Sequence, residues 1–294
     1  MNPLLTVDNL TMCFGGVTAL NRVHFNVQPA SITALIGPNG AGKTTVFNCV
    51  TGFYRATVGS IRLYGPQGGA GGVDLLALLG EPLRVSDFWQ PRRLGRRLFF
   101  KLFGGPHRVN RAGVARTFQN IRLFNELTVM ENLLVAQHAQ VDTGLVAGLL
   151  QTTHFRRQER AAVARAVEWL HFFDLVGDAN RLAGELPYGP PRRLEMARAL
   201  CTKPDLLCLD EPAAGLNPNE TRDLSQLILA LRDRHGLTIL LIEHDMGMVM
   251  DISDHLVVLD HGEVIAQGTP TAIQQDARVL AAYLGTGTSE TVLP

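Results

Sequence analysis

The sequence has few cysteines, no excess of either charge and no long apolar run. Only four of its 294 residues are cysteine and none has CxxC spacing, so we expect reduced core residues. Basic and acidic residues both number 27, which gives no reason to expect a nucleic-acid partner. No apolar run approaches the ~18 residues of a membrane-spanning helix. The start, MNPLLTVDNL, shows strand-like alternation and no signal peptide, so we expect any membrane role to act through a partner.

Short buried strands alternate with helices along most of the chain. Continuous apolar runs predict strands at 31-SITALI-36, 205-DLLCLDEP-212 and 237-LTILLIEHD-245, with a helix at about 219–235 before the last of them. This alternation predicts a mainly parallel sheet that is covered on both faces. Two further β-rich stretches predict short strands at 4–36 and a hairpin at 256–268 that turns at His261-Gly262.

A glycine-rich loop, 37-GPNGAGKTT-45, follows the first of these strands and precedes a helical run. It fits the pattern G-x-x-x-x-G-K-[ST] in a strand-to-helix context, which predicts a phosphate-binding loop for a nucleoside triphosphate. Glycine lets backbone N–H groups converge on phosphate oxygens, and the helix N-terminus adds its dipole. Lys43 would reach the β- and γ-phosphates, and the Thr44 hydroxyl would bind Mg²⁺. The residues predicted to bind nucleotide are Gly37, Pro38, Asn39, Gly40, Ala41, Gly42, Lys43, Thr44 and Thr45.

Polar residues end the other two buried strands. Asp210 stands at a carboxyl end, where α/β sheets place their ligands, and would hold Mg²⁺ through water. Glu211 fits a catalytic general base that polarises the attacking water. His244 follows the next strand and would bind the γ-phosphate and tie that water to Glu211. Two carboxylates at the end of a buried strand are costly unless a cation or donors meet them, which favours a ligand site here.

With these motifs in order, the sequence resembles the ATP-binding cassette (ABC) ATPases. Further matching features are 116-RTFQN-120 with Gln119 in the Q-loop, the D-loop 214-AGLN-217, and His244 as the switch histidine. The resemblance implies that Phe14 stacks on adenine and that Gln119 joins the Mg²⁺ ligands Thr44 and Asp210.

The same resemblance implies the fold and the domain plan. We expect an α/β fold: a P-loop ABC ATPase core with a mainly parallel sheet, an N-terminal antiparallel β subdomain and a helical subdomain. A single ABC ATPase domain is expected at 1–285, with the helical subdomain at about 120–188. A family-atypical insert is expected at about 66–108, and 286–294 is expected to be a disordered tail.

Longer phrases resemble, more narrowly, the ATP-binding subunit of branched-chain (hydrophobic) amino acid importers. They are 43-KTTVFNCVTGFYR-55, 122-RLFNELTVMENLLVAQH-138, 211-EPAAGLNPNET-221, 241-LIEHDMGMVMDISD-254 and 282-AYLG-285. Such extended matches are more specific than the shared nucleotide motifs. The resemblance implies an ATPase that uses ATP and Mg²⁺ and couples ATP-driven dimer closure to amino acid import.

The resemblance also implies the partners and the location. We expect a homodimer, or a heterodimer with a second ATP-binding subunit, together with two transmembrane permease subunits. A periplasmic amino-acid-binding protein would take part indirectly, and no nucleic acid is expected. The chain would be peripheral on the cytoplasmic face of the inner (plasma) membrane. The apolar 121-IRLF-124 would contact the membrane subunits or form local core.

The segment 184-GELPYGPPRRLEMARAL-200 stands where the family has its LSGGQ-like signature, which contacts the ATP of the opposite subunit. Pro187 lacks the hydroxyl and the N–H of the usual serine, whereas Tyr188 and Gly189 are expected to contact ATP. Pro190 and Pro191 suit the first turn of a helix, so we expect a helix to begin at 190–191. The loss of these hydrogen-bond donors predicts weaker ATP-driven closure of the dimer. The alternative is a nucleotide-binding, weakly hydrolysing regulatory subunit.

The insert at 66–108 contains the basic and apolar run 91-PRRLGRRLFFKLFGG-105. That run is typical either of an amphipathic helix against anionic lipid or of a tolerated surface loop.

Two other classes of protein fit less well. A soluble ABC protein of translation or DNA repair usually has two cassettes or a long coiled coil, and the sequence shows neither. An unrelated P-loop kinase would leave Gln119, the D-loop and His244 unexplained.

Overall fold

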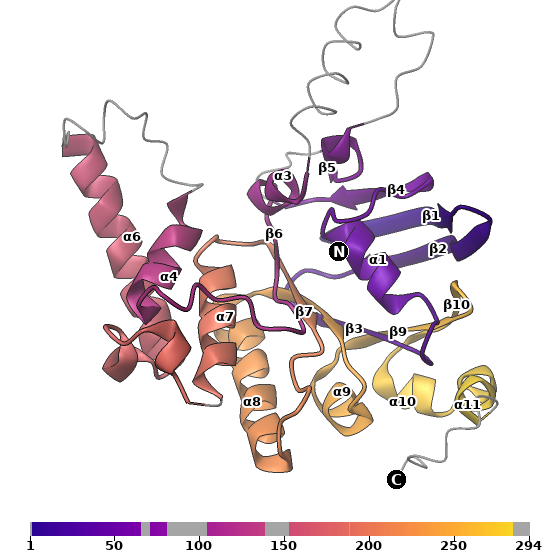
Figure 1. Ribbon diagram of the computed structural model, residues 1–294. Coiled ribbons are helices and arrows are strands. Elements are labelled where there is room, and N and C mark those ends of the chain that lie inside the picture. Colours follow the sequence, from indigo (N-terminus) through magenta and orange to yellow (C-terminus); the bar gives the residue numbers. More distant parts are fainter. Residues whose placement is uncertain (1, 66–70, 81–104, 139–152, 188, 285–294) are drawn as a thin grey trace, which may run out of the picture. The chain divides into compact units, whose positions relative to one another are not determined.

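A computed structural model describes residues 2–65, 71–80, 105–138, 153–187 and 189–284 of the chain. The chain forms two compact units (Figure 1). The first combines residues 1–114 with 205–294, and the second spans 115–204. In the described ranges, no helix is long and apolar enough to cross a membrane.

An antiparallel sheet opens the first unit. It consists of β1 (Leu5–Phe14), β2 (Val17–Val27), β4 (Val58–Leu63) and β5 (Val73–Asp74), in the order β2-β1-β4-β5. Leu5 pairs with Val27 on one side and with Leu63 on the other, and all three side chains are buried. Because successive side chains of a strand point to opposite faces, this register directs one face of the sheet into the core.

A second, mainly parallel sheet has the order β10-β9-β3-β8-β7-β6. Its strands are β3 (Ile32–Ile36), β6 (Val114–Arg116), β7 (Leu206–Asp210), β8 (Thr238–Ile242), β9 (His255–Asp260) and β10 (Glu263–Gly268). Strands β3, β7 and β8 are buried at every position, as expected for strands that are covered on both faces. Strands β9 and β10 pair antiparallel around His261 and Gly262, which confirms the predicted hairpin. The two sheets confirm the predicted α/β fold class.

One hydrophobic core joins the two sheets of the first unit through helix α1 (Lys43–Val50). Phe47 of α1 is fully buried in the same cluster as Phe25 of β2, Leu35 of β3 and Leu259 of β9. Four further helices of this unit lie on the other side of the parallel sheet (Figure 1). They are α8 (Pro218–His235), α9 (Met246–Ile252), α10 (Pro270–Gln274) and α11 (Ala277–Leu284).

Helix α8, which was predicted at about 219–235, has clear start and stop signals. Asn217 accepts bonds from the backbone N–H groups of Asn219 and Glu220, and the Glu220 carboxylate accepts one from the Asn217 N–H. This capping box satisfies donors that the first helical turn leaves unpaired. Gly236 ends the helix in the left-handed conformation.

The predicted insert is described only in part. Residues 66–70 and 81–104 lie outside the described ranges, and so does nearly all of the basic and apolar run at 91–105. The described remainder contains a 3-10 turn, η1 (Ala77–Leu79), and helix α3 (Pro106–Arg111). Leu75 and Leu76 are buried in the core of the first unit, so this part of the segment differs from a surface loop. The predicted tail at 286–294 also lies outside the described residues.

The second unit is helical. Helices α4 (Val129–Ala136), α6 (Thr153–Phe172) and α7 (Pro190–Leu200) contact one another, and 3-10 turns η4 (Val176–Asp178) and η5 (Ala183–Glu185) lie between α6 and α7 in the chain. The buried amide of Gln137, at the end of α4, donates to Ala162 O of α6 at 3.0 Å. It also accepts from Arg165 Nε at 2.8 Å. These bonds fix α6 against α4.

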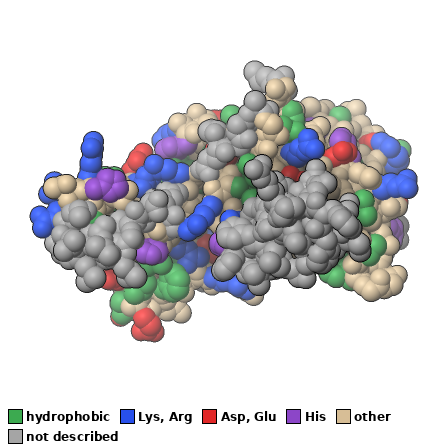
Figure 2. Space-filling model, turned by 90° about the horizontal axis from the view of Figure 1, so that it is seen from above, with side chains coloured by type: hydrophobic (Ala, Val, Ile, Leu, Met, Phe, Trp, Pro, Cys, Tyr) green, Lys and Arg blue, Asp and Glu red, His purple; other side chains and the backbone are tan. Residues whose placement is uncertain are grey.

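Figure 2 shows both basic and acidic side chains on the face it draws, with neutral and apolar ones between them.

Candidate functional site: a phosphate-loop pocket

The phosphate loop connects the central strand β3 to helix α1. Strand β3 lies between β8 and β9, and α1 begins at Lys43 with Gly42 as its N-cap. The loop therefore leaves the carboxyl edge of the parallel sheet and enters a helix N-terminus, as the motif predicts. Gly37 has φ of 145°, and a Cβ on it would lie 2.0 Å from Leu259 O. No other residue type fits there without moving β9.

Lys43 is nearly buried and points back over the loop. Its side chain is 6% exposed, and Nζ donates to the carbonyl oxygens of Gly37 at 2.6 Å and Pro38 at 3.0 Å. Burial lowers the pKa of Lys43 below its ordinary value, and the charge of Glu211 opposes that shift. A desolvated ammonium held by carbonyl oxygens is suited to exchange those oxygens for phosphate oxygens.

Glu211 and His244 come together from two neighbouring strands. Strands β7 and β8 are parallel and pair Asp210 with Ile242, so the residues that follow them emerge at one edge. Glu211 has φ of 47°, and its N–H donates to Ile242 O at 2.9 Å. The side chains of Glu211 and His244 meet with Oε1 and Nε2 2.9 Å apart. The sheet register thus assembles a carboxylate–imidazole pair.

Glu243 holds this pair in place, a role that the sequence motifs did not predict. Its side chain is buried, and Oε1 accepts from Ala213 N at 2.6 Å. Oε2 accepts from His244 N at 2.8 Å and from Asp245 N at 3.3 Å. Glu243 therefore joins the loop after β7 to the loop after β8. A buried acid beside a predicted catalytic histidine was the available signal.

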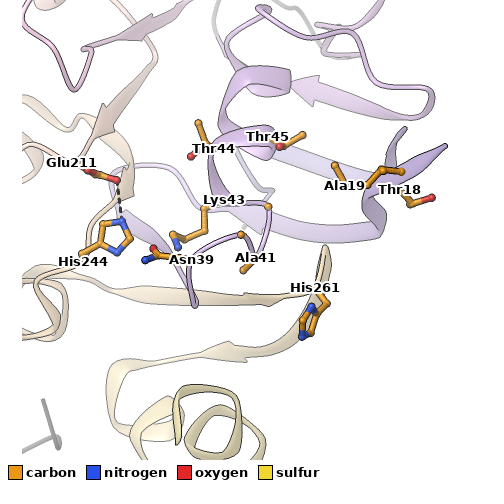
Figure 3. A pocket seen from close by; sticks show the side chains of 13 residues that line it. Thr18, Ala19, Asn39, Ala41, Lys43, Thr44, Thr45, Glu211, His244 and His261 are labelled. Carbon is orange, nitrogen blue, oxygen red and sulfur yellow. Dashed lines mark hydrogen bonds and ion pairs between the residues drawn. The ribbon is translucent and has the colours of Figure 1, made fainter. Parts of the chain in front are cut away.

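These elements enclose a pocket of about 460 Å³ (Figure 3). Glu211 and His244 lie together at one end, His261 and Thr18 lie at the other, and the phosphate loop runs between them. The pocket brings together Glu211 and His244 with seven predicted loop residues, Asn39, Gly40, Ala41, Gly42, Lys43, Thr44 and Thr45. Val17, Thr18, Ala19 and His261 also line it and were not predicted, because they reach the loop through tertiary packing.

The other predicted site residues are not lining residues of this pocket. Gly37 and Pro38 contribute the carbonyl oxygens that hold Lys43. Asp210 ends β7 with little exposure. Phe14 is 44% exposed and packs edge-on against Tyr54, with ring centroids 5.3 Å apart. These residues keep their roles as predictions.

The predicted signature and Q-loop residues belong to the second unit. Gln119 is exposed there, in the irregular segment after β6. Gly189 has φ of 112° and is the N-cap of α7, which begins at Pro190 and so confirms the predicted helix start. Tyr188 lies outside the described residues.

Comparison with known proteins gives the family. The family model described as ABC transporter matches residues 20–214, and the model described as branched-chain amino acid ATP-binding cassette transporter matches 263–288. The chain is 49% identical to the high-affinity branched-chain amino acid transport ATP-binding protein BraF of Pseudomonas aeruginosa. It is also 49% identical to LivG of Escherichia coli, which has the same description. Each alignment covers 96% of this chain and 98% of the relative.

A solved structure has the same fold. The crystal structure of an ATP-binding cassette of an ABC transporter in its ADP conformation is 29% identical, with a TM-score of 0.73. That alignment covers 97% of this chain and 100% of the other. These matches confirm the resemblance that the sequence motifs predict. The chain therefore belongs to the ABC transporter family as an ATP-binding cassette ATPase, and within it to the branched-chain amino acid transport ATP-binding proteins.

Proposed function

We propose that this chain hydrolyses Mg-ATP to drive import of branched-chain amino acids. The observation that carries the proposal is the Glu211–His244 pair, 2.9 Å apart, at one end of the pocket that contains Lys43. The pocket thus combines a phosphate-binding loop with a general base and a histidine that orients it. The 49% identity to two branched-chain amino acid transport proteins supports the choice of substrate class.

The phosphate loop binds the triphosphate by charge and by backbone donors. Lys43 Nζ leaves the carbonyl oxygens of Gly37 and Pro38 and binds the β- and γ-phosphates. The N–H groups at the start of α1 face the same anion, where the helix dipole favours negative charge. The loop is already folded around Lys43, so little ordering accompanies binding.

Glu211 acts on the water that attacks the γ-phosphate. Its carboxylate orients and polarises the water, the new O–P bond forms in line with the breaking bond to ADP, and the proton moves toward Glu211. His244 keeps Oε1 of Glu211 in place and hydrogen-bonds the transferring phosphoryl group. Glu243 holds the backbone of His244, so the pair stays aligned.

The available oxygen donors fit Mg²⁺. A hydroxyl from Thr44, a carboxylate from Asp210 and an amide oxygen from Gln119 are hard ligands, and Mg²⁺ typically completes its shell with substrate phosphates and water. When bound, the ion would neutralise charge on the β- and γ-phosphates. In the described part of the chain, no group of three or more His, Cys, Asp or Glu residues could hold a metal alone.

Transport requires partners. We infer a dimer in which Tyr188 and Gly189 of one copy contact ATP held by the other, as the family signature does. The side chains of Ile121 and Phe124 are 40% and 51% exposed, which suits contact with an apolar surface of a permease subunit. The chain would work on the cytoplasmic face of the inner membrane, beside two permease subunits and below a periplasmic binding protein. No contact in the described ranges favours the regulatory alternative.

The first prediction concerns Glu211. Glu211→Gln removes the general base and keeps the side-chain shape, so kcat for Mg-ATP hydrolysis should fall by about 10²–10⁴-fold. ATP affinity should stay unchanged, because the phosphate loop is intact. Turnover measured by phosphate release and affinity measured with a fluorescent ATP analogue check this. Glu168→Gln, on an exposed position of α6, is the matched control; hydrolysis by Glu211→Gln at the wild-type rate would rule out this base.

The second prediction concerns the substrate. Proteoliposomes that hold the chain, its two permease subunits and the binding protein should accumulate radiolabelled leucine when ATP is enclosed on the side of the chain. The Glu211→Gln complex should accumulate none above an ATP-free control, because hydrolysis resets the dimer. Uptake of another solute class, with no uptake of leucine, isoleucine or valine, would refute the proposed substrate.

The third prediction concerns the signature prolines. The triple change Pro187→Ser, Pro190→Gln and Pro191→Gln restores donors toward the γ-phosphate, and one such charge-assisted bond is worth about 1.5–3 kcal/mol. ATP-driven dimerisation, measured by light scattering in the Glu211→Gln background, should tighten by about tenfold or more. The single change Arg193→Gln in the same helical turn serves as the control. If the triple variant and its parent dimerise equally, the prolines do not weaken ATP-driven dimerisation and the prediction is wrong.

A further inference from the structure

Glu195 is a buried carboxylate with no place in the mechanism above. It lies in the middle of α7, the helix that begins directly after the signature turn, and its side chain is 3% exposed. A buried carboxylate is costly unless hydrogen bonds or opposite charges compensate it. The hydrogen-bond partners of the Glu195 carboxylate therefore indicate its role.

The carboxylate binds the backbone on both sides of Gln119. Oε1 of Glu195 accepts from Phe118 N at 3.3 Å and from Arg122 N at 3.4 Å. One oxygen atom thus closes the segment that carries Gln119 into a small loop. Burial raises the pKa of Glu195, while these N–H groups and the charges of Arg198 and Arg192 lower it.

The loop has no helix or strand of its own to satisfy its backbone. The chain from 117 to 127 is irregular, so its conformation depends on contacts from outside it. The ring of Phe118 packs under the guanidinium of Arg122, 4.6 Å from centroid to Cζ. The Glu195 carboxylate and this stacking hold the first half of the loop.

Asn132 of α4 holds the second half. Its fully buried amide accepts from Phe124 N and donates to Phe124 O, both at 3.0 Å. It also donates to Leu127 O at 3.3 Å and Thr128 O at 3.0 Å. The irregular loop is therefore fixed to α7 at one end and to α4 at the other.

We propose that Glu195 is a positioning residue for ATP hydrolysis, which ties the loop that carries Gln119 to the helix that follows the signature turn. Movement of the signature would then move Gln119 of the same copy, because one carboxylate joins them. The inference rests on the proposed function for the role of Gln119 at Mg-ATP. Glu195 itself touches neither ATP nor the metal.

Alanine and glutamine at position 195 separate positioning from simple stability. Glu195→Ala removes the acceptor, so the loop loses its fixed position and kcat should fall roughly ten- to a hundredfold. KM for ATP should stay within about twofold, because the phosphate loop is untouched. Glu195→Gln keeps an oxygen that accepts both bonds, so it should restore most of kcat. Steady-state ATPase assays of the full chain give both constants.

Gln137→Ala is the matched control for destabilisation. Gln137 is also buried and hydrogen-bonded in the second unit, but it contacts α4 and α6 and not the loop. The Gln137→Ala variant should have a Tm several degrees below that of the wild type and an unchanged kcat. An equal loss of kcat in Glu195→Ala and Gln137→Ala would reduce Glu195 to a structural residue. A Glu195→Gln variant as impaired as Glu195→Ala would also overturn the proposal.

Hydrogen–deuterium exchange tests the tie between Glu195 and the loop without measuring ATP hydrolysis. Peptides that contain the amides of Phe118 and Arg122 should exchange at least about tenfold faster in Glu195→Ala than in wild type, and at the wild-type rate in Gln137→Ala. Unchanged exchange in Glu195→Ala would refute the tie. Because this readout needs neither ATP turnover nor leucine, failure of the proposed function would be recognised separately.

Discussion

The first unit depends on a close backbone contact among three chain segments around the phosphate loop. A Cβ on Gly37 would lie 2.0 Å from Leu259 O, and a Cβ on Gly262 would lie 2.6 Å from Ala19 O. Gly262 N also donates to Ala41 O at 3.0 Å, and Gly262 O accepts from Asn21 N at 2.8 Å. The loop is thus held between the β9–β10 turn and strand β2. Because β2 belongs to the antiparallel sheet and β9 to the parallel sheet, the loop is where the two sheets meet.

This contact fixes the shape of the phosphate loop. Lys43 is enclosed by the loop and donates to two carbonyl oxygens, so its positive charge is held at the predicted phosphate site. The Glu211–His244 pair is positioned independently, by the parallel register of β7 and β8 and by the buried carboxylate of Glu243. The residues predicted to bind phosphate and those predicted to act in hydrolysis are therefore held by different parts of one sheet edge. A buried carboxylate that accepts from backbone N–H groups recurs with Glu195 in the second unit, where it holds one loop to helix α7.

The sequence predicted what is local and missed what is made by packing. The phosphate loop and the strand ends at Glu211 and His244 have fixed spacing, so both were recognised from the residues alone. His261 and Thr18 reach the pocket only because two sheets meet, and no motif marks them. Leu75 was assigned to an irregular insert, yet it is buried in the core. The sequence missed this because a short apolar run does not show by itself whether it faces the core or the solvent. The sequence shows Glu243 as an acid beside His244, but its hydrogen bond to the loop after β7 appears only in the structure.

We infer that backbone packing around Gly262 holds the phosphate loop in the shape that binds ATP. Isothermal titration calorimetry of ATP with Gly262→Ala tests it, with Gly236→Ala as the control. Both glycines have positive φ, but a Cβ on Gly236 would meet nothing within 4 Å. We predict that Gly262→Ala weakens ATP binding about tenfold or more, which corresponds to about 1.4 kcal/mol, and that Gly236→Ala leaves it unchanged. Wild-type affinity in Gly262→Ala would contradict the claim.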